Sequence, residues 1–338
     1  MDWIPEADGV FRGGGVKGLG IAGALIGFAD HPTKPVTKWV NVAGASAGAI
    51  IAAYVACGHT AQELTDLLAQ TDFRKFQDYG RLGPIAGGLT NVVGRHGIVR
   101  GRAIEAWLDE VFGDKTFASV PTPDGKSSRL KVITVDITNR AMLVLPDDLL
   151  DGEGKPAWAD PKTKEDVRPE TLTIARAVRM SMAMPYFFPP VELIWKATGQ
   201  KATLVDGGTL SNFPVWLFDS ERSPAVRPTI GITLTGGHGF GGGVEKAMKR
   251  APWAVGQGWD ILQTAMQAWD KRFVGHTTRV RTCAVDAGQV GTTDYGISDE
   301  QKHELVVSGE RAAKEFLDGF ALEDYMNSFG QKLAPPPV

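Results

Sequence analysis

Three short segments of this chain are rich in small residues and could do chemistry. One contains a serine, one begins with an aspartate, and one is a run of glycines with accessible backbone amides. In Gly44-Ala45-Ser46-Ala47-Gly48, the serine lies where a predicted strand is followed by a predicted helix. Small neighbours permit the sharp turn of a nucleophile elbow, which exposes the serine hydroxyl above the N-terminus of the helix. Ser46 is therefore a candidate nucleophile, although a turn for close helix–strand packing would have the same pattern.

The second segment, Gly13-Gly14-Gly15-Val16-Lys17-Gly18, also lies between a predicted strand and a predicted helix. It formally matches a dinucleotide-binding fingerprint, which needs an acidic residue at the end of the next strand. Because that strand ends in the serine turn instead, we favour an oxyanion hole formed by the Gly13, Gly14 and Gly15 amides. Lys17 is either an ordinary exposed lysine or a cation that fixes the loop or attracts an anionic headgroup.

The third segment, Asp206-Gly207-Gly208, directly follows a predicted strand over residues 202–205. Acidic residues at the carboxyl ends of strands lie where α/β folds build their active sites. Gly207 and Gly208 would let the chain pass close to a neighbouring loop. Taken alone, this motif is more often a turn than a catalytic base. In this order with the other two segments, it is much harder to explain as a coincidence.

Together the three motifs resemble the signature motifs of the patatin-like phospholipase family, as do the segments Arg176–Val191 and Leu204–Pro214. The resemblance covers about residues 8–220. It implies an acyl hydrolase with a Ser–Asp dyad, in which Ser46 is the nucleophile, Asp206 is the base and the Gly13–Gly15 amides hold the oxyanion. It also implies a three-layer α/β/α sandwich around a mainly parallel sheet. The remaining motif glycines would support these turns: Gly18, Gly44, Gly48, Gly207 and Gly208.

Two other interpretations remain open at this point. His238, His276 and His303 follow Asp206, so the chain order of a Ser–Asp–His esterase or lipase of the α/β-hydrolase type is available. Against it, few strands fit ahead of residue 44, whereas an α/β-hydrolase elbow follows several strands. The other alternative is a catalytically idle lipid-binding or scaffolding module. Such a module would require neither Ser46 nor Asp206.

Alternation of apolar strands with helices predicts an α/β fold that would hold these motifs. We expect one domain, with residues 8–220 as the patatin-like part and residues 221–338 completing it or forming a cap. Residues 73–100 are expected to form a cap or lid, and residues 146–169 a flap or disordered loop. Strands are expected at 9–11, 39–42, 130–137, 141–145, 202–205, 229–234 and 279–285, and helices at 18–29, 47–57, 60–70, 102–111, 171–184, 244–273 and 299–317.

Composition restricts the class of protein further. The chain has 338 residues, of which 43% are hydrophobic and 22% are charged, as in a globular protein with a sizeable core. Its net charge of −3 gives no sign of a nucleic-acid partner. Two distant cysteines, Cys57 and Cys283, fit a reducing compartment. No motif indicates a metal or another cofactor. The sequence has no signal-peptide pattern and no apolar run long enough to span a bilayer, so we expect a cytoplasmic protein with transient membrane contact.

Several aromatic residues fit a lipid or ester substrate, although core packing is the favoured explanation for them. One apolar helix face would carry Trp259, Leu262, Met266, Trp269 and Phe273. Phe187, Phe188 and Trp195 share the same ambiguity. The sequence makes no prediction of the oligomeric state.

Overall fold

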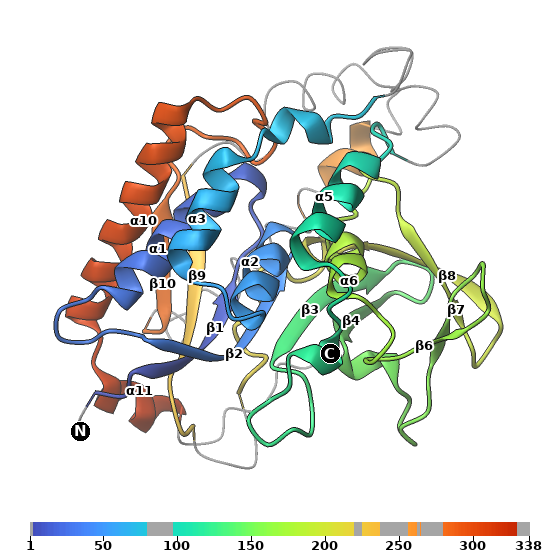
Figure 1. Cartoon of the computed structure of the whole chain (residues 1–338), viewed down its shortest axis with the longest axis horizontal. Coiled ribbons are helices and arrows are strands. Elements are labelled where there is room, and N and C mark those ends of the chain that lie inside the picture. The colour runs from blue at the N-terminus through green and yellow to red at the C-terminus, as the bar shows by residue number, and fades with distance from the viewer. Residues whose placement is uncertain are drawn as a thin grey trace.

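The computed structural model describes residues 3–79, 97–219, 225–236, 256–261, 264 and 280–329 (Figure 1). Within these residues, a 10-stranded mixed sheet has the order β10-β9-β1-β2-β3-β8-β7-β5-β6, with β4 paired to β3 outside this path. The strands are β1 (Glu6–Phe11), β2 (Lys38–Ala45), β3 (Leu130–Asp136), β4 (Ala141–Leu145), β5 (Trp158–Ala159), β6 (Asp166–Val167), β7 (Val191–Trp195), β8 (Gln200–Asp206), β9 (Thr229–Thr235) and β10 (Thr282–Asp286).

Parallel pairing joins the strands on one side of the sheet, from the edge strand β10 to β3. β10, β9, β1, β2 and β3 pair in parallel, in that order. Beyond β3, the strands β8, β7, β5 and β6 continue the sheet with antiparallel pairing, and β4 forms the predicted hairpin with β3. The predicted α/β class, with a sheet flanked by helices, is confirmed.

Helices cover the face of the sheet that is turned toward the viewer in Figure 1, where α1, α3 and α10 lie over the parallel strands and α5 and α6 lie near β3. Their apolar faces and the strands beneath them form the main core. The helices are α1 (Gly18–Ala29), α2 (Ala47–Ala56), α3 (Ala61–Gln70), α5 (Arg102–Phe112), α6 (Ile174–Ser181), α10 (Asp299–Gly319) and α11 (Leu322–Phe329).

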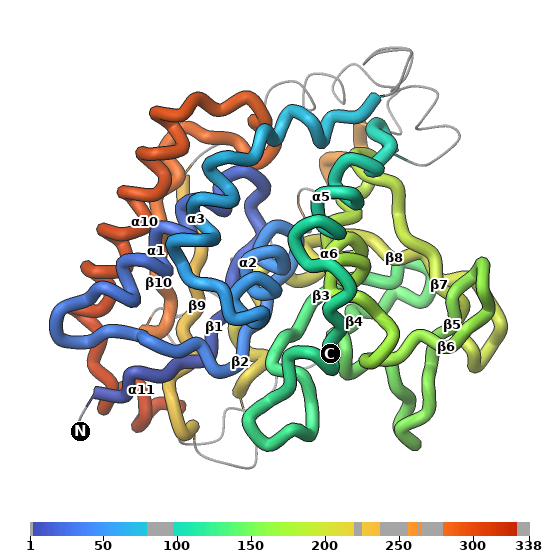
Figure 2. Tube along the Cα trace, in the orientation of Figure 1, coloured from blue at the N-terminus to red at the C-terminus, as the bar shows by residue number. Residues whose placement is uncertain are grey.

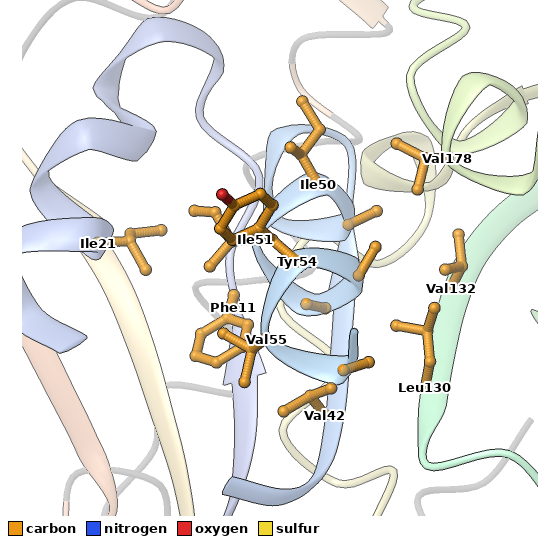
Figure 3. Packing of buried hydrophobic residues seen from close by; sticks show 14 of the residues in the cluster. Phe11, Ile21, Val42, Ile50, Ile51, Tyr54, Val55, Leu130, Val132 and Val178 are labelled. Atoms are coloured by element: carbon orange, nitrogen blue, oxygen red, sulfur yellow. The ribbon is translucent and has the colours of Figure 1, made fainter. Parts of the chain in front are cut away.

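Helix α2, which begins directly after Ser46, is buried along its whole length. Its sequence is apolar nearly all round because neighbours pack against it on several sides. Figure 3 shows Ile51 and Tyr54 on one side of this helix, with Leu130 and Val178 on the other. The serine turn is therefore anchored to the most deeply packed helix of the core.

On the opposite face of the sheet, a non-helical segment supplies the cover among the described residues. Side chains alternate between the two faces of a strand, so Val10 and Ala43 point away from α2. They pack against Phe213 and Val215 in a separate small cluster. The segment after Asp206 thus crosses beneath β1 and β2, which keeps it close to the glycine loop.

The part of the chain after residue 220 contributes directly to the same sheet and core. β9 and β10 extend the sheet beside β1. α10 lies so close to α1 that a Cβ added at Gly23 would collide with the backbone of Val306, and one added at Gly309 with that of Gly20. We therefore propose that residues 221–338 complete the domain rather than form a separate cap.

Several predicted elements differ from the structure. Residues 146–169, expected as a flap or disordered loop, contain β5 and β6 beside β7 at the edge of the sheet (Figure 2). The strand β7 was not predicted. The helix predicted over 171–184 spans residues 174–181, because Thr173 caps it by accepting a hydrogen bond from the Arg176 amide. Most of the predicted lid (residues 80–96) and most of the predicted helix 244–273 lie outside the described residues.

Candidate active site

Strand β3 brings the predicted nucleophile and the predicted base together. One edge of β3 pairs with β2 along its first half and with β8 along its second half. Ala45, at the end of β2, pairs with Ile133, while Asp206, at the end of β8, pairs with Thr134. Because β2 is parallel to β3 and β8 is antiparallel to it, the carboxyl ends of both strands meet at this point.

Ser46 occupies the sharp turn that the sequence predicts between β2 and α2. Its backbone has φ 55° and ψ −130°, a conformation that costs a non-glycine residue about 1–3 kcal/mol. Close backbone approaches explain the flanking glycines. A Cβ added at Gly44 would collide with the carbonyl of Gly48, and one added at Gly48 would collide with the carbonyl of Phe11.

The Asp206 carboxylate contacts the serine hydroxyl directly. Ser46 Oγ donates a hydrogen bond of 2.8 Å to Asp206 Oδ2, and the Gly208 amide donates one of 2.7 Å to Asp206 Oδ1. The Asp206 residue is only 1% exposed. Burial raises the pKa of Asp206 to about 7, although the two hydrogen bonds oppose the shift. At neutral pH this carboxylate is therefore close to its point of half-ionisation, where a general base works well.

Two residues that the sequence analysis did not single out hold the motifs in place. Ser181 Oγ accepts a hydrogen bond of 2.9 Å from the Ser46 amide and donates one of 2.6 Å to the carbonyl of Ile133. Asn212 accepts a hydrogen bond from the Gly13 amide at its carbonyl, and its Nδ2 donates to the carbonyl of Gly13, each at 3.2 Å. Both residues lie in segments that resemble the family, but their residue types alone gave no signal.

The backbone amides of Gly13, Gly14 and Gly15 differ in whether they already donate a hydrogen bond. The Gly13 amide already donates to Asn212, whereas the described part of the chain offers no hydrogen-bond acceptor to the amides of Gly14 and Gly15. Gly15 has φ 59°, and a Cβ added there would collide with the carbonyl of Thr292. The same carbonyl accepts a hydrogen bond from the Val16 amide. This geometry narrows the predicted oxyanion donors to Gly14 and Gly15.

Lys17, at the end of this loop, is not an ordinary exposed lysine. It is 8% exposed. Burial lowers the pKa of Lys17 to about 8, and the neighbouring Arg12 guanidinium contributes in the same direction while Asp294 opposes it. The reading of Lys17 as a surface residue is therefore wrong. A role for it toward an anionic headgroup stays a prediction.

An apolar cavity of about 50 Å³ begins at the serine turn. It extends from Gly15 and Ala47 toward α3 and α5. Phe188 lines this cavity, while Phe187 is buried beside it and Trp195 lies in β7. The cavity is lined by Gly15, Val16, Gly18, Leu19, Ala47, Ile50, Ile51, Leu68, Phe73, Phe76, Trp107, Met182, Phe188 and Tyr295.

Among the described residues, the histidines lie away from Ser46 and Asp206. His303, on α10, lines a different cavity together with Asp286 and Arg311. His31 bonds to Asp318, and His59 stacks on Tyr54. His238 and His276 lie outside the described residues.

Trp259 is the one residue of the predicted aromatic helix face that lies among the described residues. Trp259 is buried and packs edge-to-face against Tyr186, with 6.2 Å between the ring centroids, which supports core packing there. Leu262, Met266, Trp269 and Phe273 are not among the described residues.

The described ranges contain no group of three or more His, Cys, Asp or Glu side chains placed to hold a metal ion. None of the helices in those ranges is long and apolar enough to cross a membrane.

Comparison with known proteins shows which family this chain belongs to. The family model "Patatin-like phospholipase" matches residues 9–219, and the chain therefore belongs to that family. It is 34% identical over 315 residues to the uncharacterized protein YqhO of Bacillus subtilis, covering 92% of this chain and 97% of that protein. It is 27% identical over 216 residues to a cUMP-AMP-activated phospholipase of Escherichia coli, covering 64% of this chain and 58% of that protein.

A solved structure supports the same fold. VipD from Legionella pneumophila aligns with a TM-score of 0.51 and 16% sequence identity, covering 93% of this chain and 67% of that chain. At this level of identity the likeness concerns the fold alone.

Proposed function

We propose that this protein hydrolyses carboxylic ester bonds of phospholipids or other acyl lipids, with Ser46 as nucleophile and Asp206 as general base. The observation that carries the proposal is the direct hydrogen bond of 2.8 Å between Ser46 Oγ and Asp206 Oδ2. Membership of the patatin-like phospholipase family supports a lipid substrate. The strained turn at Ser46 adds support, because such strain is concentrated at functional sites.

The proposed reaction has two halves. First, Ser46 Oγ attacks the ester carbonyl carbon while its proton moves to Asp206 Oδ2. The tetrahedral intermediate then collapses, Asp206 returns the proton to the leaving alcohol, and the acyl group stays on Ser46 as an ester. Second, Asp206 deprotonates a water molecule that attacks this ester, and the fatty acid leaves as Ser46 regains its proton.

Charge on the substrate oxygen would be stabilised from two directions. The amides of Gly14 and Gly15, which have no acceptor within the described ranges, are the proposed donors of the oxyanion hole. The N-terminus of α2 begins directly after Ser46, and its positive dipole end favours negative charge at that place.

A membrane-embedded or dispersed lipid would supply the acyl chain. The apolar cavity that starts beside Ser46 offers a dry environment to the carbons next to the scissile ester, and α1, α2, α3 and α5 contribute to its lining. We infer peripheral and transient membrane contact, because the substrate is expected to reside in lipid surfaces.

Covalent labelling with a fluorophosphonate probe tests the assignment of Ser46. We expect the wild-type protein to be labelled at Ser46 and to release fatty acid from defined phospholipids, lysophospholipids or acylglycerols. Ser46→Ala should abolish both signals. Ser308→Ala, a matched control on α10, should keep both. A folded wild-type protein that shows neither labelling nor hydrolysis would instead support an idle lipid-binding or scaffolding module.

A further inference from the structure

Two aromatic side chains separate the cavity beside Ser46 from a second, larger cavity. The second cavity has a volume of about 350 Å³ and lies between the C-terminal half of α3 and the outer face of α5. Phe76 and Trp107 line both cavities. Their rings meet edge-to-face, with 5.5 Å between centroids and 61° between planes. We call this pair the aromatic wall.

The aromatic wall is held by contacts on both of its sides. Phe76 is buried and packs edge-to-face against Phe73. The carboxylate of Asp78 accepts hydrogen bonds of 2.8–3.2 Å from the backbone amides of residues 100–103, at the start of α5. Asp78 thereby ties the segment that carries Phe76 to the helix that carries Trp107.

The size of the inner cavity limits what can enter it. An apolar cavity of about 150 Å³ is known to hold one benzene molecule, which has six carbons. By this measure, the inner cavity of about 50 Å³ has room for only a few carbon atoms of an acyl chain. The outer cavity, about 350 Å³, could hold most of a long chain, but the aromatic wall stands between it and Ser46.

We propose that the aromatic wall sets the acyl-chain length of the substrate, with Trp107 as the specificity-determining residue. The inference rests on the proposed ester hydrolysis at Ser46 and adds the substrate class: esters whose scissile acyl chain is short. Trp107 is the better residue to change, because it is partly exposed and lies on one face of α5, whereas Phe76 is buried. Removal of the indole would join the two cavities.

The lining of the outer cavity fits a chain that enters after this change. Leu67, Ala103 and Ala106 offer apolar surface. The same cavity is also lined by Gln70, Thr71, Asp72, Lys75 and Glu110. The long side chains among them can keep their polar ends in water while a chain passes.

The test compares kcat/KM for p-nitrophenyl esters with acyl chains from about two to about twelve carbons in the wild-type protein and in Trp107→Ala. We expect the wild-type optimum at short chains. In Trp107→Ala the ratio of long-chain to short-chain kcat/KM should rise by about tenfold or more, since a few methylene groups in an apolar pocket are worth that much. Trp107→Leu, a milder change, should shift the ratio in the same direction.

Leu67→Ala is the matched control, because Leu67 lines the outer cavity without lining the inner one. This variant should keep the wild-type optimum. An unchanged optimum in both folded Trp107 variants, with Ser46 still labelled by a fluorophosphonate, would overturn the role of the aromatic wall and leave the proposed hydrolysis intact. Absence of both esterase activity and labelling in the wild-type protein would instead refute the proposed function itself.

Discussion

The hydroxyl of Ser46 donates a hydrogen bond of 2.8 Å to the carboxylate of Asp206, although 160 positions separate the two residues in the sequence. The shared edge of β3 creates this contact, because β2 ends there from one direction and β8 from the other. If β8 ran parallel to β3, its carboxyl end would point away from β2. The change from parallel to antiparallel pairing is thus what places a carboxylate directly on the serine.

The first prediction concerns the pH dependence of hydrolysis. Asp206 must be ionised to accept the serine proton, and its pKa is raised to about 7. We therefore expect kcat/KM for a non-titrating ester to fall about tenfold for each pH unit below 7 and to level off above it. A profile measured from about pH 5 to 9 checks this. A profile that stays flat below pH 7 in folded protein would contradict the role of Asp206 as base.

Ionisation of the same buried carboxylate should lower the stability of the fold as the pH rises from about 4 to about 7. Its folded-state pKa lies above the ordinary value of 3.8, so between about pH 4 and pH 7 the folded state holds a proton that the unfolded state has released. The free energy of unfolding therefore decreases as the pH rises through this window, by up to about 4 kcal/mol for such a shift.

Asp206→Asn removes this charge and should melt at a higher temperature than the wild-type protein at pH 8. The difference between the two proteins should shrink toward pH 4, where the wild-type carboxyl is protonated in the folded state. Thermal melting across this range checks the prediction. An equal difference at pH 4 and pH 8 would mean that ionisation of Asp206 is not its cause.

Alanine substitutions at the neighbouring residues Gly14 and Gly15 should have different effects on stability and turnover. A Cβ at Gly14 would collide with the end of the Leu234 side chain, which can move, whereas a Cβ at Gly15 would collide with the backbone of Thr292. Gly15 also has φ 59°, a strained conformation for other residues. We expect Gly14→Ala to keep its melting temperature and lose turnover by about tenfold or more. Gly15→Ala should lose several degrees of melting temperature. Unchanged turnover in Gly14→Ala would show that a side chain at this position does not disturb the oxyanion hole.

Much of the fold and the main site motifs could be predicted from the sequence because each depends on local backbone requirements. Gly44 and Gly48 are small for a steric reason that applies to any tight strand–helix turn, and Asp206 follows an apolar strand. The parallel strands can also be recognised in the sequence as short apolar runs between helices. The direct contact between Ser46 and Asp206 was expected from the family resemblance rather than from these local signals.

What could not be predicted depends on contacts between distant segments. The strands β5 and β6 have two residues each and lie in a long polar segment that resembles a loop, so their pairing is visible only once β7 lies beside β5. Burial of Lys17 and the bond that engages the Gly13 amide likewise require neighbours from residues after 200. No periodicity in the sequence carries that information.

Ser181 provides a test of positioning. Its hydroxyl joins the Ser46 amide to the carbonyl of Ile133, so Ser181→Ala leaves both buried groups without a partner, at a cost of about 1–3 kcal/mol each. We expect a lower melting temperature and a kcat reduced about tenfold, with little change in KM or in the pH midpoint. Ser211→Ala is the control, because the Ser211 hydroxyl is also buried but has no hydrogen-bond partner among the described residues. Equal effects of the two variants would contradict the positioning role.

The last prediction separates a dyad from a triad. A triad needs an imidazole to carry the serine proton, whereas in a dyad the carboxylate carries it directly. Asp206→Asn keeps the side-chain shape but removes the base, so turnover should fall by a factor on the order of 10³ or more. His238→Ala, His276→Ala and His303→Ala should each keep most of the activity. Thermal melting of every variant distinguishes a catalytic loss from a folding defect. If one histidine variant lost as much turnover as Asp206→Asn at an unchanged melting temperature, that histidine would be the base and the direct contact between Ser46 and Asp206 would not be the catalytic one.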